Sequence, residues 1–444
     1  MKNKTLTYPK ITAIGFAMLI LTGTILLMLP ISSKTGGASF IDALFTATSA
    51  GCITGLVPFD TFTNWSVFGQ LVIIVLIQTG GLGFITLLAA AVKLFTRKMS
   101  LKQKMLLKES IGSLSLGDVK SLVRSVVVFT AICELVGAAV LSTRFVPIAG
   151  LRRGIYMALF TSISAYCNAG FDLMGQYAPS SSLTTVNDDP IILLTLSLLI
   201  IFGGLGFIVW ADMKTRKFKW KKFSAHTKLT LITTAFLLVV PTIMFFVFEY
   251  GESMKDMPLA DKIFNSFFCS VTPRTAGFNS VDNAALSPQS KMVTIMLMFI
   301  GGSTGSTAGG VKVTTVAILV LCLLSSVRES DDVNAFDKRI MPETIKTAIA
   351  IITFNLSLIL IGVVAISLSD SQFHLTDIIF ECTSAMGTVG MSTGITPDLS
   401  VFAKLVIIGL MYIGRLTSLI FAMSFAHMKP KTSTHKPKIK IMIG

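Results

Sequence analysis

Four related strings decide the fold: LFTATSAGCITGL (44–56), LFTSISAYCNAGF (159–171), NSFFCSVTPRTAGF (265–278) and IFECTSAMGTVGM (379–391). Each contains one glycine that aligns with the others, namely Gly55, Gly170, Gly277 and Gly390. A phenylalanine stands ten residues before that glycine in every copy, and an apolar residue follows it. This self-similarity indicates one structural unit that is present four times.

A second set of motifs follows downstream: QTGGLGF (78–84), IFGGLGF (201–207), FIGGSTG (299–305) and YIGRLTS (412–418). The third and fourth lie 25 residues beyond the aligned glycine, and the first lies 26 residues beyond it. The second lies 34 residues beyond it, which predicts an inserted outer loop around Gln176–Asp189.

The composition is that of an integral membrane protein. Apolar residues make up 52% of the 444 residues and charged residues only 14%, whereas ordinary globular proteins have about 25% charged residues. The first apolar run, 11–29, is long enough to span a bilayer and lacks a small-residue cleavage site. We therefore expect it to be a membrane helix rather than a signal peptide.

Eight apolar segments have the length of a membrane-spanning helix: 11–29, 66–92, 122–143, 190–211, 228–249, 291–325, 345–367 and 401–426. Within each successive pair lies a shorter apolar stretch: 40–51, 154–166, 260–271 and 375–386. A helix of about 12 residues cannot cross the bilayer core, so these stretches are predicted to be re-entrant or interfacial.

The basic residues predict the orientation in the membrane. If the N-terminus is cytoplasmic, the inner segments hold 27 of the 38 Lys and Arg residues but only eight of the 23 acidic residues. Both termini are then cytoplasmic, and the net charge of +15 reports topology rather than a nucleic-acid partner. Binding of acidic lipid or an acidic partner to the inner face is the alternative interpretation.

Because each unit contains two full spans, successive units enter the membrane from the same side. Parallel repeats can surround an axis along the membrane normal, which disfavours a carrier built on inverted repeats. The predicted fold is an all-α membrane protein in which four parallel M1–P-loop–M2 repeats, with eight transmembrane helices and four re-entrant pore helices, surround a central pore. The predicted repeats are 1–108, 109–224, 225–340 and 341–444.

The aligned glycines suit a ring of backbone carbonyls that replaces the hydration shell of a potassium ion. Carbonyls that point the same way require positive φ at some residues, which glycine adopts without steric cost. The alternative is that these glycines only cap short helices. We assign the ion-binding filter to the aligned triplets Ile53, Thr54, Gly55; Asn168, Ala169, Gly170; Thr275, Ala276, Gly277; and Thr388, Val389, Gly390.

The third unit contains GGSTGSTAGG (301–310), with five glycines in ten residues. Each glycine in a helix interior costs about 1 kcal/mol relative to alanine, so this stretch is predicted to interrupt its span. We interpret it as a gating loop in the pore, with a close-packed helix surface as the alternative. A phosphate-binding loop is excluded, because Gly310 precedes Val311-Lys312 rather than Lys followed by Ser or Thr.

The gating assignment comprises Gly301, Gly302, Ser303, Thr304, Gly305, Ser306, Thr307, Ala308, Gly309, Gly310, Lys312 and Arg415. Arg415 stands where the other units have Gly81, Gly204 and Gly302. An arginine within a span is costly and functional by default, and here it would oppose cation passage. The alternative is that it pairs with Glu134.

Other chemistry is not indicated. The six cysteines form no C-x-x-C pair and the four histidines are scattered, so neither a redox framework nor a metal site is expected. No cluster of acid, base and nucleophile lies at membrane depth, and we expect no enzymatic activity. We expect no cofactor to bind this chain.

The sequence resembles the membrane subunits of the Ktr/Trk/HKT superfamily of potassium transporters, and most closely the bacterial Ktr type (the KtrB/KtrD group). The resemblance covers nearly the whole chain and rests on VTPRTAGFNS (271–280), the GGLGF strings and the terminal GRLTS. It implies a selectivity filter at the four aligned glycines, an intramembrane gating loop at 301–310 and an arginine, Arg415, under the filter.

The resemblance also implies a homodimer in the bacterial plasma membrane and a cytoplasmic ring of nucleotide-binding regulatory subunits of the KtrA/KtrC type. The basic inner loops 93–108 and 213–228 are expected to dock that ring. We expect channel-like potassium uptake, with potassium as the transported ion and sodium as an activator. A sodium-coupled potassium symporter on the same scaffold is the alternative.

Overall fold

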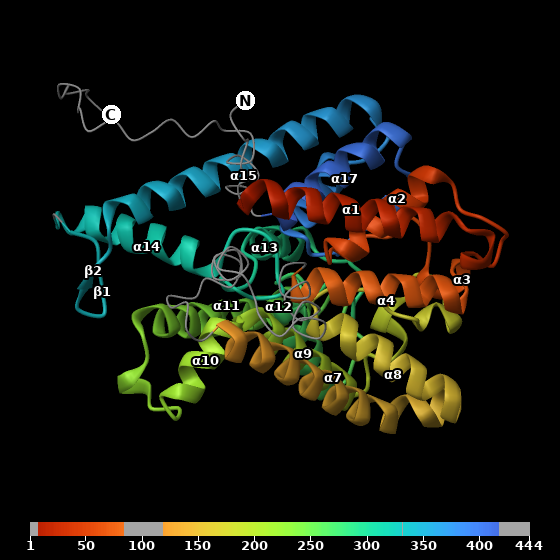
Figure 1. Ribbon diagram of the computed structural model, residues 1–444, viewed down its shortest axis with the longest axis horizontal. Coiled ribbons are helices and arrows are strands. Elements are labelled where there is room, and N and C mark those ends of the chain that lie inside the picture. Colours follow the sequence, from red (N-terminus) through yellow and green to blue (C-terminus); the bar gives the residue numbers. More distant parts are fainter. Residues whose placement is uncertain (1–7, 84–118, 331, 417–444) are drawn as a thin grey trace.

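The computed structural model describes residues 8–83, 119–330 and 332–416, and these are almost entirely helical (Figure 1). In the described residues the only strands are β1 (Asn334–Ala335) and β2 (Lys338–Arg339), which form a short antiparallel hairpin with two residues in each strand. The prediction of an all-α architecture is confirmed.

The helices follow one another in four sets, each with a long helix, a short helix, a loop and a second helix. The first two sets are α1 (Tyr8–Met28), α2 (Phe40–Gly51), α3 (Thr61–Asn64), α4 (Val67–Leu82), α7 (Val119–Ala149), α8 (Leu151–Tyr166), α9 (Pro190–Leu205) and α10 (Phe207–Thr215). The last two are α11 (Ala225–Glu249), α12 (Leu259–Val271), α13 (Pro288–Phe299), α14 (Val313–Val327), α15 (Pro342–Ser369), α16 (Leu375–Gly387) and α17 (Val401–Arg415). Short 3-10 turns are η1 (Pro30–Ser32), η2 (Met174–Gln176), η3 (Ser182–Thr185), η4 (Trp220–Lys222) and η5 (Thr396–Asp398).

The lengths of these helices follow the membrane pattern. Four described helices are long and apolar enough to span a bilayer: Lys10–Met28, Arg124–Ala149, Ala225–Glu249 and Pro342–Ser369. The short helices α2, α8, α12 and α16 match the four stretches predicted to be re-entrant, with ends that differ by at most a few residues. The insertion predicted in the second unit is a loop that carries η2 and η3.

Two predicted spans are not straight helices. The span 190–211 is wrong as a single helix, because the chain bends by 87° between α9 and α10. Gly206, at that bend, has a φ of +87°, which ends the helix. The span 291–325 is broken between α13 and α14, as its glycine content predicts. The distal parts of spans 66–92 and 401–426, and the predicted boundary at 108, lie outside the described residues.

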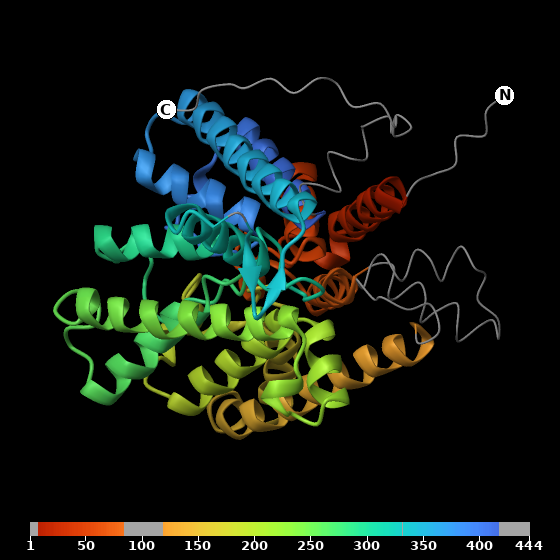
Figure 2. The same cartoon turned by 90° about the vertical axis from the view of Figure 1, so that its left-hand side faces the viewer.

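Neighbouring sets pack against one another in a closed order. α4 contacts α8, α9 contacts α12, α13 contacts α16, and α17 contacts α2. Each set therefore touches the next, and the fourth touches the first. Figure 2 shows this closure, with the blue fourth set beside the red first set.

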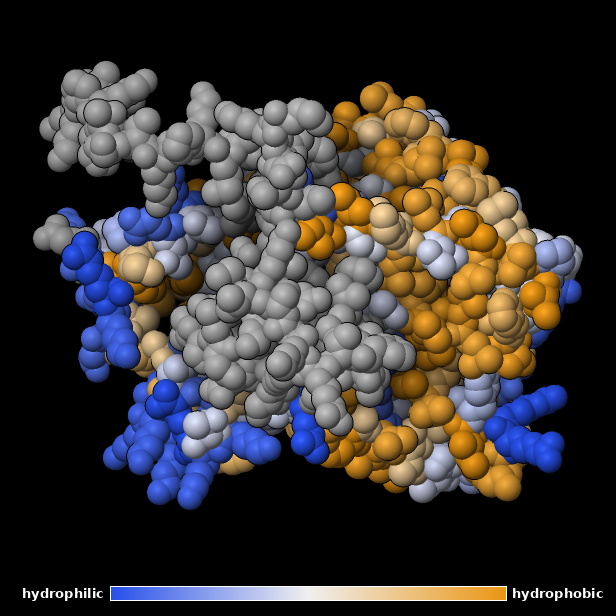
Figure 3. All heavy atoms as spheres, viewed as in Figure 1, coloured by the Kyte–Doolittle hydropathy of each residue, from blue (hydrophilic) through white to orange (hydrophobic). Residues whose placement is uncertain are grey.

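The surface is divided between an apolar belt and polar ends. On the face in Figure 3, hydrophobic residues cover the region of α1, α4 and α8, whereas hydrophilic residues gather at the end that carries α10 and the β1–β2 hairpin. Met18, Leu21 and Ile25 of α1 are more than half exposed, which is the pattern expected of side chains that face lipid.

A polar contact joins the C-terminal end of the first helix in each unit, which is predicted to be the outer end, to the start of the second. In the fourth unit, Asp370 accepts hydrogen bonds from Ser400 N (2.9 Å) and Ser400 Oγ (2.6 Å). In the third, Glu249 accepts equivalent bonds from Ser287 N (3.0 Å) and Oγ (2.6 Å). The other two units use Ser66 Oγ to Ile31 O (2.5 Å) and Arg144 Nε to Asp189 Oδ2 (2.6 Å). These ties hold the two helices at a fixed spacing around each short helix.

Candidate functional site

The four aligned glycines meet at one place in the centre of the molecule. A Cβ built on Gly55 would lie 2.6 Å from Ala169 O, and one built on Gly170 would lie 2.7 Å from Ala276 O. A Cβ on Gly277 would meet Val389 O, and one on Gly390 would meet Thr54 O. Each loop thus touches the next in chain order and the fourth touches the first, so the four backbones form a closed ring with no room for side chains at these positions.

The same backbone conformation recurs in all four loops. The residue two before each glycine and the glycine itself have positive φ, while the residue between them does not. The values are +53° and +98° at Ile53 and Gly55, +58° and +71° at Asn168 and Gly170, +72° and +81° at Thr275 and Gly277, and +52° and +92° at Thr388 and Gly390. Alternating handedness turns successive N–H groups to one side, so the carbonyls turn to the other.

The N–H side of the loops faces the short helices. Thr54 N donates to Ser49 O (2.7 Å) and Gly55 N donates to Ser49 Oγ (2.9 Å). The equivalent bonds in the fourth loop are Val389 N to Ser384 O (2.8 Å) and Gly390 N to Ser384 Oγ (3.1 Å). In the second loop Ala169 N donates to Ser164 O (2.8 Å), but Ser164 Oγ accepts from Phe171 N (2.9 Å), one residue after the aligned glycine. These serines therefore bind loop amides on the side of the short helices.

Sequence reasoning missed these serines, although the signal was present. Ser49, Ser164 and Ser384 each stand six residues before the aligned glycine and precede an alanine. The third loop departs from this pattern, because Thr272 O takes the N–H of Ala276 (2.9 Å) instead. The departure coincides with the Pro273-Arg274 pair of the VTPRTAGF string.

Three of the four residues at the first positive-φ position are β-branched: Ile53, Thr275 and Thr388. A non-glycine residue held there costs of order 1–3 kcal/mol, so the surrounding contacts must impose the conformation. Asn168, the fourth, donates from Nδ2 to Arg274 O and lies 3.3 Å from Thr275 Oγ1, which links the second and third loops.

A cavity of about 220 Å³ lies on the side of the ring that the charge distribution predicts to be extracellular, and we call it the vestibule. The four glycines form its floor, and the carboxylates of Asp60, Asp172 and Asp282 line its wall. Charged walls of one sign in a concave site raise the local concentration of the opposite ion. The vestibule is therefore suited to gather cations above the ring.

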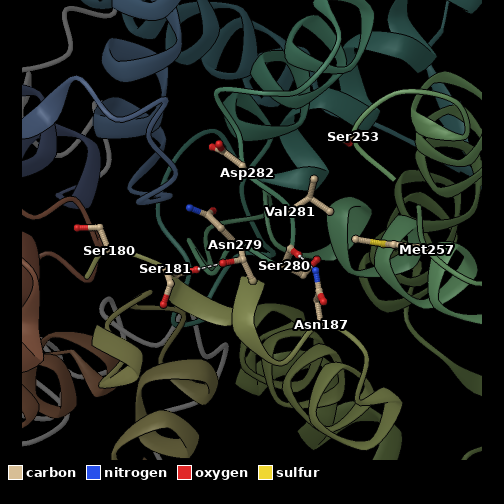
Figure 4. Close-up of a pocket in the computed structure, with 10 residues that line it drawn as sticks. Ser180, Ser181, Asn187, Ser253, Met257, Asn279, Ser280, Val281 and Asp282 are labelled. Atoms are coloured by element: carbon tan, nitrogen blue, oxygen red, sulfur yellow. Dashed lines mark hydrogen bonds between the residues drawn. The ribbon is translucent and has the colours of Figure 1, made fainter. Parts of the chain in front are cut away.

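A second polar cavity of about 340 Å³ opens beside the vestibule, and the two share Ser180, Asn279 and Asp282. Figure 4 shows that its lining comes from the outer loops of the second and third units. Asn187 Nδ2 donates to Ser280 O (3.0 Å) across it. Hydroxyl and amide groups dominate the lining, so the second cavity widens the aqueous approach to the ring.

The glycine-rich stretch lies on the inner side of the ring. No residue from 301 to 312 is helical, which excludes the close-packed helix surface. Its backbone bonds to the bend of the second unit: Ser303 N to Gly204 O (2.9 Å) and Phe207 N to Gly305 O (2.9 Å). A Cβ on Gly309 would meet the Thr388 side chain, so the stretch packs directly against the filter loops.

Arg415 links the glycine-rich stretch to the first unit by hydrogen bonds. Its Nη1 donates to Thr307 O and its Nη2 to Gly80 O. Glu134 accepts instead from Gln78 Nε2 (3.0 Å), and no salt bridge joins it to Arg415 in the described part of the chain, so the alternative ion pair is not formed. Lys312 Nζ donates to Ala308 O (2.7 Å) within the stretch.

The fold and this site define a class: a helical membrane protein in which four loop tips and a glycine-rich break converge on a single axis. Residues 7–436 match the family model described as "TrkH: Cation transport protein". The chain belongs to this family of cation transport proteins, and the resemblance inferred from the sequence is confirmed.

Characterised relatives cover the whole chain. The Ktr system potassium uptake protein B of Bacillus subtilis is 41% identical over 95% of this chain and 93% of its own length. The potassium/sodium uptake protein NtpJ of Enterococcus hirae is 37% identical over 100% and 98%. The crystal structure of the potassium transporter TrkH from Vibrio parahaemolyticus shares the fold, with a TM-score of 0.75 at 17% identity over 96% of this chain and 86% of that one.

Cation uptake is expected to weaken in acid through Asp172. Burial raises the pKa of Asp172 to about 6, and the charge of Asp60 raises it too, although a hydrogen bond from Met174 N lowers it. The carboxylate is therefore charged at pH 7 and gains a proton as the pH falls through 6. Between an external pH of about 7.5 and about 5.5, the half-saturating cation concentration should rise about two- to fivefold.

Asp172→Asn should show the high half-saturating concentration at both pH values. Asp256→Asn, which changes an exposed outer carboxylate away from the vestibule, should keep the pH dependence. An unchanged pH profile in Asp172→Asn would remove this carboxylate from the cation path.

Proposed function

We propose that this chain is the ion-translocating subunit of a potassium uptake system, with channel-like flux through a backbone filter and an intramembrane gate. The closed ring of four loops with alternating φ carries this proposal. It provides main-chain oxygens from four directions, which is how potassium filters replace the ion's hydration shell. The printed names of the relatives, which are potassium or potassium/sodium uptake proteins, support potassium as the ion.

In this proposal the filter oxygens come from the four aligned triplets that end at Gly55, Gly170, Gly277 and Gly390. The short helices that precede them end at the ring, so their carbonyl ends add negative potential there. The four M1–P-loop–M2 repeats, 1–108, 109–224, 225–340 and 341–444, each supply one triplet.

The gate in this proposal is the stretch 301–310, with Lys312 and Arg415 as its charged attachments. Arg415 binds one carbonyl of the stretch and one of α4, so it tethers the stretch across the inner side of the filter. Charge-assisted bonds of this kind are about twice as strong as neutral ones. The guanidinium also places a positive charge in the path of a cation.

The assembly belongs to the proposal as well. We place the chain in a bacterial plasma membrane with both termini cytoplasmic, as a homodimer with a nucleotide-binding regulatory ring. The name "Ktr system" of the relatives supports a multi-component transporter. Of the two basic segments expected to dock the ring, 213–228 runs from the end of α10 to the start of α11, and 93–108 lies outside the described residues.

The filter assignment is tested by Gly277→Ser. Gly277 has a φ of +81°, and an added Cβ would meet Val389 O, so the fourth loop must shift. We expect the ratio of potassium to sodium flux in proteoliposomes to fall about tenfold, which corresponds to about 1.4 kcal/mol. Gly409→Ser is the matched control, because nothing lies within 4 Å of its Cβ position. An unchanged ratio in folded Gly277→Ser protein would remove this loop from the filter.

The gate is tested by Arg415→Ala, which removes both bonds to Thr307 O and Gly80 O. Without regulatory subunits, potassium flux should rise several-fold, because the stretch loses its tether and the pore loses a positive charge. Arg415→Lys keeps the charge but not the forked geometry, and it should give an intermediate flux. Arg152→Ala, which changes an exposed arginine at the start of α8, is the control. Wild-type flux in stable Arg415→Ala protein would contradict the gate.

A sodium-coupled symporter is the second candidate, favoured by the potassium/sodium name of one relative. The two mechanisms differ in their response to a sodium gradient. Uptake of rubidium into vesicles with equal sodium on both sides should proceed at the same initial rate as uptake with an inward sodium gradient. Strict dependence on the gradient would support the symporter and defeat the channel-like mechanism.

A further inference from the structure

The short helix α16 carries a carboxylate that its three counterparts lack. Glu381 lies nine residues before Gly390, and the same offset gives Thr46, Thr161 and Phe268 in the other units. Its side chain is completely buried, with 0% exposure. A fully buried carboxylate is costly unless it is paired or coordinates a metal ion.

The protein supplies only part of that compensation. Thr396 Oγ1 donates to Glu381 Oε1 and lies 3.0 Å from Ser392 Oγ. The second oxygen, Oε2, makes no hydrogen bond of normal geometry among the described residues, although the Ser392 hydroxyl interacts with the carboxyl group. Lys291 pairs with Asp377 (3.7 Å), one turn earlier on α16, and no salt bridge reaches Glu381 in the described part of the chain.

The cluster is next to the vestibule. Ser392, Thr393 and Thr396 all line that cavity, and they belong to the loop that leaves the filter after Gly390. Thr393 Oγ1 is another buried oxygen without a partner among the described residues. A cation in the vestibule is therefore separated from Glu381 only by the hydroxyl-bearing loop.

We propose that Glu381, Ser392 and Thr396 form a second cation site, outside the filter, for a monovalent ion of sodium's size. Carboxylate and hydroxyl oxygens are ligands for hard cations. One carboxylate balances one positive charge, which favours a monovalent over a divalent ion. The oxygens of Thr396 and Ser392 are 3.0 Å apart, so both can reach one ion of sodium's size. A bound ion would stabilise the conformation of the loop 391–399, which follows the fourth filter triplet.

Glu249 shows what a purely structural carboxylate looks like in this protein. It is also fully buried, with 0% exposure, but both of its oxygens have partners. Oε1 accepts from Ser287 N and Oγ, and Oε2 accepts from Ser253 Oγ (2.5 Å). Glu249 is therefore a matched control for burial and charge without a free ligand oxygen.

The experiment is a thermal-shift titration of the purified full-length protein in detergent, with sodium chloride replacing choline chloride at constant ionic strength. Potassium is held at a fixed saturating concentration so that the filter remains occupied. A ligand that binds only the folded state raises Tm in a saturable way. The wild type should show such a rise with sodium, and Glu381→Gln should not. Glu249→Gln should keep the rise, whatever its starting Tm.

Thr396→Val is a second variant that keeps the carboxylate and removes one hydroxyl ligand, and it should shift the titration to at least several-fold higher sodium. The proposal is overturned if the wild type shows no sodium-specific rise, or if Glu381→Gln or Thr396→Val responds like the wild type. Equal rises with sodium and choline would show a salt effect only and would overturn it as well. Because the readout is independent of flux, failure here is distinguishable from failure of the proposed transport function.

Discussion

The close approach of four polypeptide backbones around one axis is the constraint on which the structure depends. At Gly55, Gly170, Gly277 and Gly390, an added Cβ would collide with a carbonyl or Cα of the neighbouring loop. Glycine at these positions removes the steric obstacle, but it does not hold the loops in place. The loops are held by hydrogen bonds from their amides to serines of the short helices. The polar contacts between the first and second helices of each unit fix the spacing of the longer helices. In the proposed filter the loop carbonyls face the axis, since the bonded amides lie on the side of the short helices.

Function in such a ring comes from departures from fourfold symmetry. The four loops contribute to the ring in the same way, whereas a gate formed by one unit requires that unit to differ in sequence from the others. The third unit has a glycine-rich break in place of a straight second helix, and the fourth has Arg415 where the others have glycine. These two departures contact each other through Thr307 O. Glu381 is a third departure, and it lies on the outer side of the same unit as Arg415. The fourth unit thus carries charged groups on both sides of the filter.

The structural features that the sequence predicted are those that depend on residue type at a fixed spacing along the chain. The short helices, the aligned glycines and the break at 301–310 all depend on chain length or on the cost of glycine in a helix, and all appear at the predicted positions. Contacts between units could not be predicted in the same way. The bend at Gly206 is bonded to the third unit through Gly204 O and Phe207 N, and the partners of Arg415 are carbonyls, which every residue has. The positive φ of Thr388 is imposed by its surroundings and runs against its β-branched side chain.

The bend in the second unit and the break in the third explain each other. Non-helical backbone at membrane depth is tolerated only where it is buried in protein or lines a watery cavity. Gly204 O is released by the end of α9 and accepts from Ser303 N, and Gly305 O accepts from Phe207 N at the start of α10. Each interruption therefore satisfies the groups that the other leaves free. Moving the stretch 301–310 out of the axis breaks these bonds, and water must replace them. If the stretch is the gate proposed above, its opening and the hydration of the path beneath the ring are one event.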